Sequence, residues 1–197
     1  MGRWEPDAQG RLLTAAMELF GEHGYEATTT AQIAERAGLT KTTLFRLFAD
    51  KREIVFQGQG RLITAAETGI RDAPPQASPI EVLEAGITAL ADEHHQDRRQ
   101  VGRTLDPILA ASPELQERAV YKRWSITRAV EDALAARLAD RRAAGLLADL
   151  GVRAYYTGYE GWVAADDDRT LSDWARAELA AASATLQHVL TGTGQKR

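Results

Sequence analysis

The chain has 197 residues, a length that fits one compact unit or a small domain fused to a larger one. Its residues are 44% apolar, 26% charged and 7% aromatic, which is the composition of a globular protein and excludes a chain disordered throughout. The absence of cysteine excludes disulfide frameworks, thiolate metal sites and cysteine nucleophiles. The formal charge of −4 argues against a protein that coats nucleic acid through bulk positive charge.

The sequence offers no segment that suits a membrane. No uncharged apolar stretch approaches the roughly 18 residues that a spanning helix needs. The residues from Met1 to Pro6 lack the apolar run of a secretion signal. We therefore expect a cytoplasmic protein without a membrane partner.

Hydrophobic periodicity predicts helices along the whole chain. Residues 7–23 carry a stripe with the period of one helix face, formed by Leu12, Ala16, Leu19 and Phe20. Thr29 and Gln32 have the spacing of a capping box before a second, short helix that reaches Ala37. Thr40 can cap a third helix that runs to about Leu47.

The rest of the chain predicts six further helices. A fourth extends from Lys51 to just before Pro74, and the cap-proline-glutamate pattern of 78–81 starts a fifth. A short sixth precedes Pro107, and a long seventh begins at Ser112. The last two fit residues 145–164 and 171–190, and the run from Thr170 to Asp173 starts the second of them. Since two-residue alternation and hairpin turns are missing, we expect an all-α fold of about nine helices.

Residues 30–49 have the pattern of a helix-turn-helix, in which two short helices cross over a small shared core. A small residue at Ala34 lets the helices approach, and Gly38 permits the turn. The apolar positions are Ile33, Ala37, Leu39, Leu44 and Leu47. The outer side of the third helix is then free to enter a DNA major groove, whose width admits one α-helix.

Charge is concentrated in the same region. Within residues 36–52 five cations face a single anion, Asp50, which gives a local charge of +4 in an acidic chain. An anion site is therefore expected here first, with a solvated charged surface as the alternative.

These motifs resemble the DNA-binding end of the TetR family of bacterial transcriptional regulators. The resemblance lies in Gly24-Tyr25, Thr28-Thr29, the run from Ile33 to Lys41, Leu44-Phe45, Phe48 and Lys51. It implies an amino-terminal three-helix DNA-binding domain, residues 1–50, and a larger helical domain, residues 51–197, that binds a small effector and forms a homodimer. Most members of the family repress their targets and leave DNA when the effector binds.

The resemblance also implies roles for particular residues. The base or phosphate readers at the start and outer face of the third helix are Thr40, Lys41, Thr42 and Thr43. The phosphate-binding candidates are Thr28, Thr29, Arg46 and Lys51. Phe45 stands where the family most often has tyrosine, so it can offer only its ring to the sugar-phosphate chain. Capping or solvation is the alternative for each threonine, and an ion pair with Asp50 is the alternative for Arg46.

Two aromatic stripes mark the larger domain. Tyr121 and Trp124 are three residues apart, and Tyr155, Tyr159 and Trp162 follow helical spacing. They form either the core or a subunit interface, or they line the pocket of the effector. A small-residue face on the eighth predicted helix, Gly151, Ala154, Gly158 and Gly161, is consistent with the last two helices pairing with their copies in a homodimer.

Enzymatic function has no support in the sequence. The Glu-x-x-His pairs of di-metal oxidases and the glycine-rich phosphate loops are both missing, and adjacent His94 and His95 point too far apart to share a metal. We expect no catalytic residue, cofactor or metal. The sequence predicts a ligand-responsive DNA-binding regulator, a repressor that binds a near-palindromic operator as a homodimer and is released by a small, largely apolar or aromatic effector. The alternative is a helical adaptor that binds protein instead of DNA.

Overall fold

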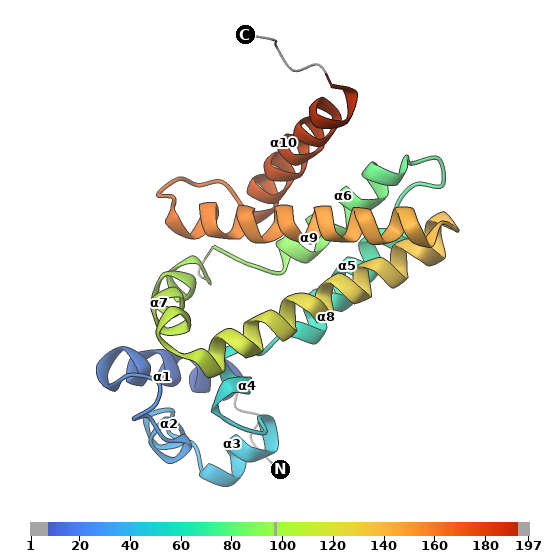
Figure 1. Ribbon diagram of the computed structural model, residues 1–197. Helices are drawn as coiled ribbons and strands as arrows, with labels where there is room; N and C mark the ends of the chain where they lie inside the picture. The colour runs from blue at the N-terminus through green and yellow to red at the C-terminus, as the bar shows by residue number, and fades with distance from the viewer. Residues whose placement is uncertain (1–7, 97, 193–197) are drawn as a thin grey trace. The chain divides into compact units, whose positions relative to one another are not determined.

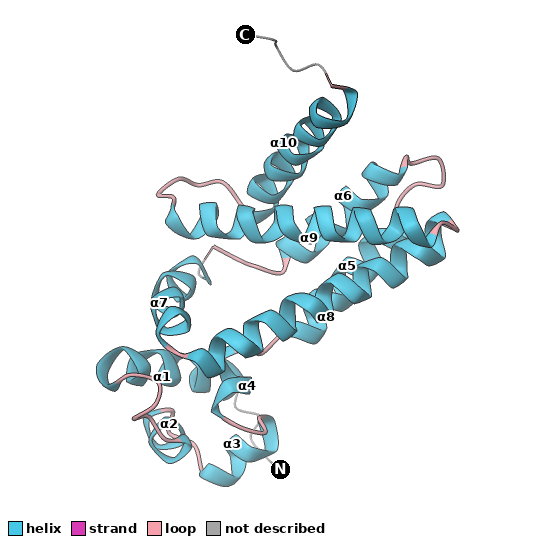
Figure 2. Ribbon diagram, viewed as in Figure 1, coloured by secondary structure: helices cyan, strands magenta, loops and turns pink. Residues whose placement is uncertain are grey.

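The computed structural model describes residues 8–96 and 98–192. Within that part of the chain it contains ten α-helices joined by loops and no strand (Figure 2), which confirms the all-α class. In chain order (Figure 1) they are α1 Ala8–His23, α2 Thr30–Arg36, α3 Lys41–Leu47, α4 Lys51–Val55, α5 Gln59–Asp72, α6 Pro79–Asp92, α7 Arg98–Ala111, α8 Pro113–Leu138, α9 Arg141–Ala164 and α10 Leu171–Thr191.

The predicted helix starts are confirmed where a local cap defines them. At α2 the Thr29 hydroxyl accepts the Gln32 N–H at 3.3 Å, and the Gln32 side-chain oxygen accepts the Thr29 N–H at 2.8 Å. Asp173 and Thr170 form the same reciprocal pair at α10. These bonds span three residues and satisfy backbone donors that the first turn leaves open, so sequence alone predicts them.

The expectation of one continuous helix after Lys51 was wrong. Two helices, α4 and α5, take its place, separated at residues 56–58. Gly58 has φ +85°, a conformation that interrupts an α-helix and that glycine adopts without steric cost. The sixth helix is also longer than predicted, because α7 accommodates Pro107 in its interior.

Two compact units divide the chain, and the first is not a continuous stretch of sequence. It comprises Met1–Gly58 together with Gln100–Lys122. Its core joins apolar residues of α1 to α4, such as Leu12, Ile33 and Leu44, with Leu115 of α8, and Leu105 and Ile108 of α7 pack against it. The sequence-based division at residue 50 therefore differs from the packing, because the helices α7 and α8 each contribute to both units.

The second unit comprises Gln59–Arg99 and Arg123–Arg197. In it α5 packs against α6, α9 packs against α10, and α6 contacts both α9 and α10. Its buried core includes Leu83 and Ile87 of α6, Ile126 of α8 and Trp162 of α9. No helix among the described residues is both long and apolar enough to cross a membrane.

The small-residue face of α9 packs within this unit. A Cβ atom added to Gly158 would lie 2.8 Å from the backbone nitrogen of Ala175 in α10, and one added to Gly151 would lie 2.5 Å from Leu83 in α6. Close helix approach is thus confirmed for Gly151 and Gly158. The partners are helices of the same chain, however, so these glycines do not supply the expected contact with a second copy.

Candidate nucleic-acid interface

The turn between α2 and α3 is a left-handed glycine turn. Gly38 has φ +66°, and the N–H groups of Gly38 and Leu39 donate to the carbonyls of Glu35 and Ala34 at 2.9 and 2.8 Å. Arg11 of α1 donates to the carbonyl of Ala37 and, at 3.4 Å, to that of Gly38. These bonds satisfy the carbonyls at the end of α2 and fix the angle at which α3 leaves the turn.

The small core of the module is confirmed. Ile33, Ala34 and Leu44 are fully or almost fully buried, while Leu39 and Leu47 are partly buried against the same cluster. Leu44 is the buried residue of the seven-residue helix α3 and marks the side that faces the core. The opposite side of the helix therefore faces the surface.

The opposite side of α3 carries most of the predicted DNA contacts. Lys41, Thr42, Phe45 and Arg46 are exposed, and the Phe45 ring keeps 47% of its surface open to solvent. The Lys41 ammonium lies 5.8 Å from the centre of that ring. The structure thus brings two cations, a hydroxyl and an aromatic ring together on one short helix surface, the combination that can meet phosphates and base edges.

Thr40 and Thr43 also have a structural role. Thr40 precedes α3, its hydroxyl accepts the Thr43 N–H at 3.1 Å, and the two hydroxyl oxygens are 2.9 Å apart. The capping interpretation is therefore confirmed for Thr40. A hydroxyl has further hydrogen-bonding capacity, so capping does not remove it from a nucleic-acid surface.

Thr28 and Lys51 differ from expectation. The Thr28 side chain is 2% exposed, and its hydroxyl donates to the carbonyls of Leu19 and Gly24 at 3.2 and 2.8 Å. The Lys51 ammonium donates to the carbonyls of Tyr25 and Thr28 at 2.8 and 3.3 Å. The predicted phosphate contacts of Thr28 and Lys51 are therefore corrected. The Thr28 hydroxyl proton is already donated within the fold. The Lys51 side chain mainly connects α4 to the loop before α2.

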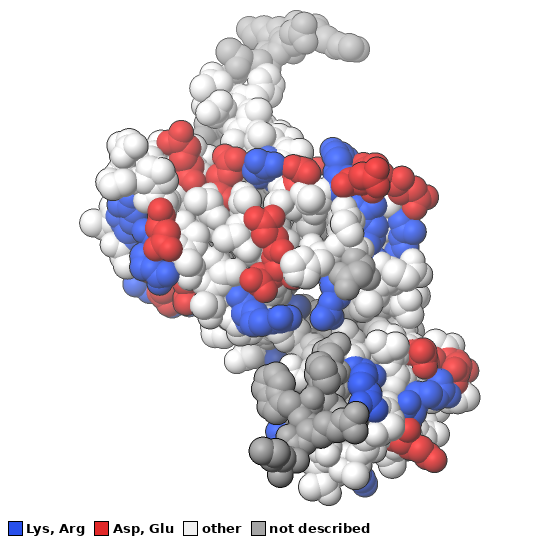
Figure 3. Space-filling view, turned by 180° about the vertical axis from the view of Figure 1, so that it is seen from behind, with Lys and Arg blue, Asp and Glu red and all other residues white. Residues whose placement is uncertain are grey.

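Two of the five cations of residues 36–52 are paired with acidic groups within the fold. Arg36 pairs with Glu22 at 2.8 Å and with Glu18 at 3.3 Å, and its hydrogen bond lowers the pKa of Glu22. Arg52 pairs with Asp50 at 2.5 Å, and no pair between Arg46 and Asp50 occurs within the described part of the chain. On the molecular face drawn in Figure 3, basic and acidic groups are interspersed. Among the cations of residues 36–52, Lys41, Arg46 and Lys51 form no ion pair with a described acidic group, and Lys51 donates to carbonyls instead.

The aromatic residues predicted to line the effector pocket separate into two groups. Tyr155, Tyr159 and Trp162 surround the His94 ring, with ring centres 5.9 to 6.5 Å from it. Tyr155 and Trp162 are buried in the core, and the Trp162 indole nitrogen has no hydrogen-bond acceptor among the described residues. Tyr121 and Trp124 lie instead on the surface of α8, each more than half exposed. The core interpretation holds for Tyr155 and Trp162.

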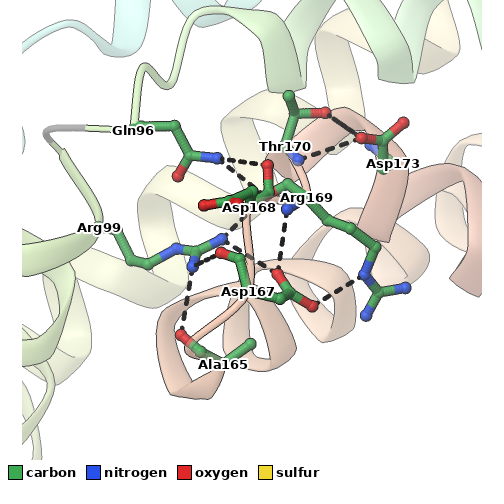
Figure 4. Close-up of polar contacts among 8 residues, drawn as sticks. All are labelled: Gln96, Arg99, Ala165, Asp167, Asp168, Arg169, Thr170 and Asp173. Atoms are coloured by element: carbon green, nitrogen blue, oxygen red, sulfur yellow. Dashed lines mark hydrogen bonds and ion pairs between the residues drawn. The ribbon is translucent and has the colours of Figure 1, made fainter.

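Arg99 is a structural residue that sequence reasoning missed. Figure 4 shows its guanidinium pointing into the loop between α9 and α10, where it donates to the carbonyls of Ala165, Asp167 and Arg169 at 3.2, 2.5 and 2.8 Å. Gln96 donates to two carbonyls of the same loop. The partners of Arg99 lie 66 to 70 positions away, so no local pattern could have revealed this contact.

Comparison with known proteins agrees with this architecture. Residues 12–57 match the sequence model of bacterial regulatory proteins of the tetR family. The chain is 49% identical over 45 residues to the uncharacterized HTH-type transcriptional regulator YvkB of Bacillus subtilis, a match that covers 23% of this chain and 24% of YvkB. It is 32% identical over 108 residues to the HTH-type transcriptional repressor KstR2 of Mycobacterium tuberculosis, covering 53% of this chain and 54% of KstR2.

The whole fold also has relatives among solved structures. One is the transcriptional regulator FadR of Bacillus subtilis in complex with stearoyl-CoA, with a TM-score of 0.55 at 19% identity over 88% of this chain and 96% of FadR. The curated relatives are matched over only a quarter to about half of their length. An all-helical chain with this module has the architecture of helix-turn-helix regulators. The amino-terminal part of the chain, residues 12–57, is therefore similar to the tetR family of bacterial regulatory proteins.

Proposed function

We propose that the protein is a transcriptional regulator that binds double-stranded DNA through α3. The observation that carries the proposal is the composition of the outward side of α3, where Lys41, Thr42, Phe45 and Arg46 are exposed above a buried core. A helix presented in this way suits the major groove, in which bases are distinguished by their donors and acceptors. The work of such a protein lies in the bacterial cytoplasm, where the chromosome is.

The geometry supports a proposed role for each residue of the interface. Lys41 and Thr42 are the proposed base readers, since both are exposed near the start of α3. Thr40 and Thr43 assist them with their remaining hydrogen-bonding capacity. The proposed phosphate and sugar contacts are Thr29, Phe45 and Arg46, all exposed. Thr28 and Lys51 act indirectly, because both hold the loop before α2 in place.

The proposed active form is a homodimer that pairs through α9 and α10. Support comes from the carboxy-terminal part of α10, where Leu186, Val189 and Leu190 are exposed on one side and Leu190 keeps 75% of its surface open. Exposed apolar groups of this kind mark interaction surfaces. Two copies would read half-sites about 34 to 36 Å apart, which is one turn of DNA, on a near-palindromic operator. A folded monomer that persists at nanomolar concentration would contradict this pairing.

The proposed regulation is repression that a small, largely apolar or aromatic effector relieves. KstR2 is described as a repressor, and FadR was solved with stearoyl-CoA. In this chain the cluster of Tyr155, Tyr159 and Trp162, within the second unit, supplies aromatic surface for such a ligand. Tyr121 of the first unit and Trp124 of the second are further candidates, because each exposes its ring on α8. The buried indole N–H of Trp162 offers a donor to it. The ligand can shift DNA binding only by the difference between its affinities for the two states.

Selection from a random duplex pool tests the proposal. The full-length protein is expected to enrich a two-fold symmetric sequence and to bind it in fluorescence anisotropy with an affinity that falls steeply with salt. Reporter expression from a promoter that carries this sequence should decrease when the protein is present. If no duplex binds even at low ionic strength, the protein is not a DNA-binding regulator and the adaptor function replaces it.

A further inference from the structure

A cavity of about 610 Å³ lies within the first unit, apart from the proposed DNA contacts. It is bounded by the carboxy end of α1, the loop that follows it, and the second half of α7. All of its lining residues belong to the same compact unit. Its volume falls within the range of about 300 to 1,000 Å³ that is typical of small-molecule sites.

The walls of this α1–α7 cavity are mainly apolar. Phe20 supplies an aromatic side chain, and Pro107, Ile108 and Ala111 supply the facing wall from α7. Apolar walls of this kind favour a ligand with a bulky apolar body, because burying that body removes its surface from water.

Charge restricts the ligand further. No lysine or arginine lines the cavity, and its ionisable lining residues are His23, Tyr25 and Glu26. Glu26 accepts a hydrogen bond from the Ser112 hydroxyl at 3.4 Å. The Nε2 atom of His23 lies 3.5 Å from a carboxylate oxygen of Glu22. The helices α1 and α7 both end at this cavity with partial negative charge, while α8 begins there, after Ser112, with partial positive charge. The formal charge of Glu26 therefore remains the main electrostatic feature of the cavity. This electrostatic environment favours a cation and disfavours a carboxylate or phosphate.

The cavity also contacts the loop that positions the DNA-binding module. Gly24, Tyr25, Glu26 and Ala27 line it, and the chain continues from there into the cap of α2 at Thr29. The Tyr25 carbonyl is one of the two acceptors of Lys51. A ligand in the cavity would therefore touch the segment through which α2 and α4 are tied together.

We propose that the α1–α7 cavity binds an organic cation with a bulky apolar or aromatic body, and that this ligand modulates DNA binding. The second part of the proposal rests on the proposed function. The site is separate from the aromatic cluster of the second unit, since it has neither its residues nor its elements in common with that cluster.

Two probes of nearly equal shape and opposite charge test the binding. Tetraphenylphosphonium and tetraphenylborate are titrated separately into the full-length protein by isothermal calorimetry in a sodium buffer. We expect tetraphenylphosphonium to bind at one site per chain and tetraphenylborate to bind at least about tenfold more weakly. Equal affinities for both probes would overturn the charge argument and with it the proposal.

Variants locate the site. Glu26→Gln removes the carboxylate and is expected to weaken tetraphenylphosphonium about fivefold, the effect of one charge near a protein surface. Ala111→Phe fills the cavity from an exposed position and should abolish binding. The control Glu35→Gln removes an exposed carboxylate of α2 and should change nothing. Binding that survives both Glu26→Gln and Ala111→Phe, in proteins with unchanged circular dichroism, would place the probe elsewhere and overturn the proposal.

Coupling is measured separately with the selected duplex. Tetraphenylphosphonium should shift the DNA affinity of the parent protein and leave that of Ala111→Phe unchanged. If the cation binds without any shift, the modulation is refuted. If no duplex binds at all, the proposed function and the modulation fail together, whereas calorimetry still decides whether the cavity is a cation site.

Discussion

At the scale of single residues, Lys51 shows how a charged group can support a surface without facing it. Its ammonium donates to the carbonyls of Tyr25 and Thr28 and lies 4.0 Å from the centre of the Tyr25 ring. Both partners lie more than 20 positions earlier in the chain. The loop that precedes α2 is thus held to the first residue of α4, and the position of α2 depends on that bond.

Replacing Lys51 with methionine should therefore lower stability as well as DNA affinity. We expect the free energy of unfolding to fall by about 1 to 2 kcal/mol, because two carbonyls lose a charged donor. Binding should weaken to a similar degree on all duplexes, since no base reader changes. Urea denaturation and anisotropy measure the two effects, with Lys41→Met as the control that leaves stability nearly unchanged. A Lys51→Met protein as stable as the parent would show that these hydrogen bonds do not stabilise the fold.

The Asp50 carboxylate makes the stability of the first unit depend on pH. Burial raises its pKa, but hydrogen bonds from the Arg52 guanidinium and the Glu53 N–H outweigh burial, so the net pKa is lowered. Because the unfolded chain then binds more protons, the stabilisation is present above about pH 4 and is lost as the pH falls through the lowered pKa.

The variant Asp50→Asn should reveal how much the Asp50 carboxylate stabilises the fold. It can still cap α4 through its side-chain oxygen but has no charge to titrate. We expect the parent to exceed it in stability by a few tenths of a kcal/mol at pH 6, a small value because the pair is partly exposed, and by less at pH 3. Urea denaturation at the two pH values measures the difference. A gap that is the same at pH 3 as at pH 6 would contradict the assignment.

At the scale of elements, the close packing of α9 depends on the positions of its glycines. Gly158 faces the backbone of α10, whereas the Cβ position of Gly145 in the same helix has its nearest neighbour, the Glu131 carboxyl carbon, at 4.0 Å. The two glycines carry the same cost in helix propensity but differ in their surroundings. One is required by close approach and the other is not.

Alanine at these two positions should have opposite effects. Gly158→Ala places a methyl group against backbone atoms that cannot move aside, so we expect a loss of about 1 to 3 kcal/mol in the free energy of unfolding. Gly145→Ala should instead stabilise the protein by about 0.5 to 1 kcal/mol through helix propensity. Thermal and urea denaturation of both variants provide the comparison. Equal effects would mean that α9 and α10 are not packed as described.

At the scale of the whole molecule, sequence predicted what neighbouring residues determine. The caps at Thr29, Thr40 and Thr170 and the outward side of α3 follow from spacings of three or four residues. The break at Gly58 was missed because a glycine within a helical pattern is often tolerated. Pattern could not reveal the contribution of Gln100–Lys122 to the first unit, since that packing joins segments far apart in the chain.

The candidate site shows the same limit. Its exposed residues, Lys41, Thr42, Phe45 and Arg46, were predicted by helical period and by resemblance to the family. The internal partners of Arg36 and Lys51 were not, because Glu22 and Tyr25 come from the preceding helix and loop. Local charge counted along the sequence therefore overstates the positive charge that a DNA duplex can meet.

The central claim, that the outward side of α3 reads base sequence, is tested most directly by equilibrium binding to two duplexes. The parent protein, Lys41→Ala, Thr42→Ala and the exposed control Arg142→Ala are each titrated against the selected duplex and a scrambled duplex at the same salt concentration. We predict that Lys41→Ala and Thr42→Ala lose about 1 to 3 kcal/mol on the selected duplex and much less on the scrambled one, with Arg142→Ala unchanged on both. Equal losses on the two duplexes, or no loss on either, would contradict the claim.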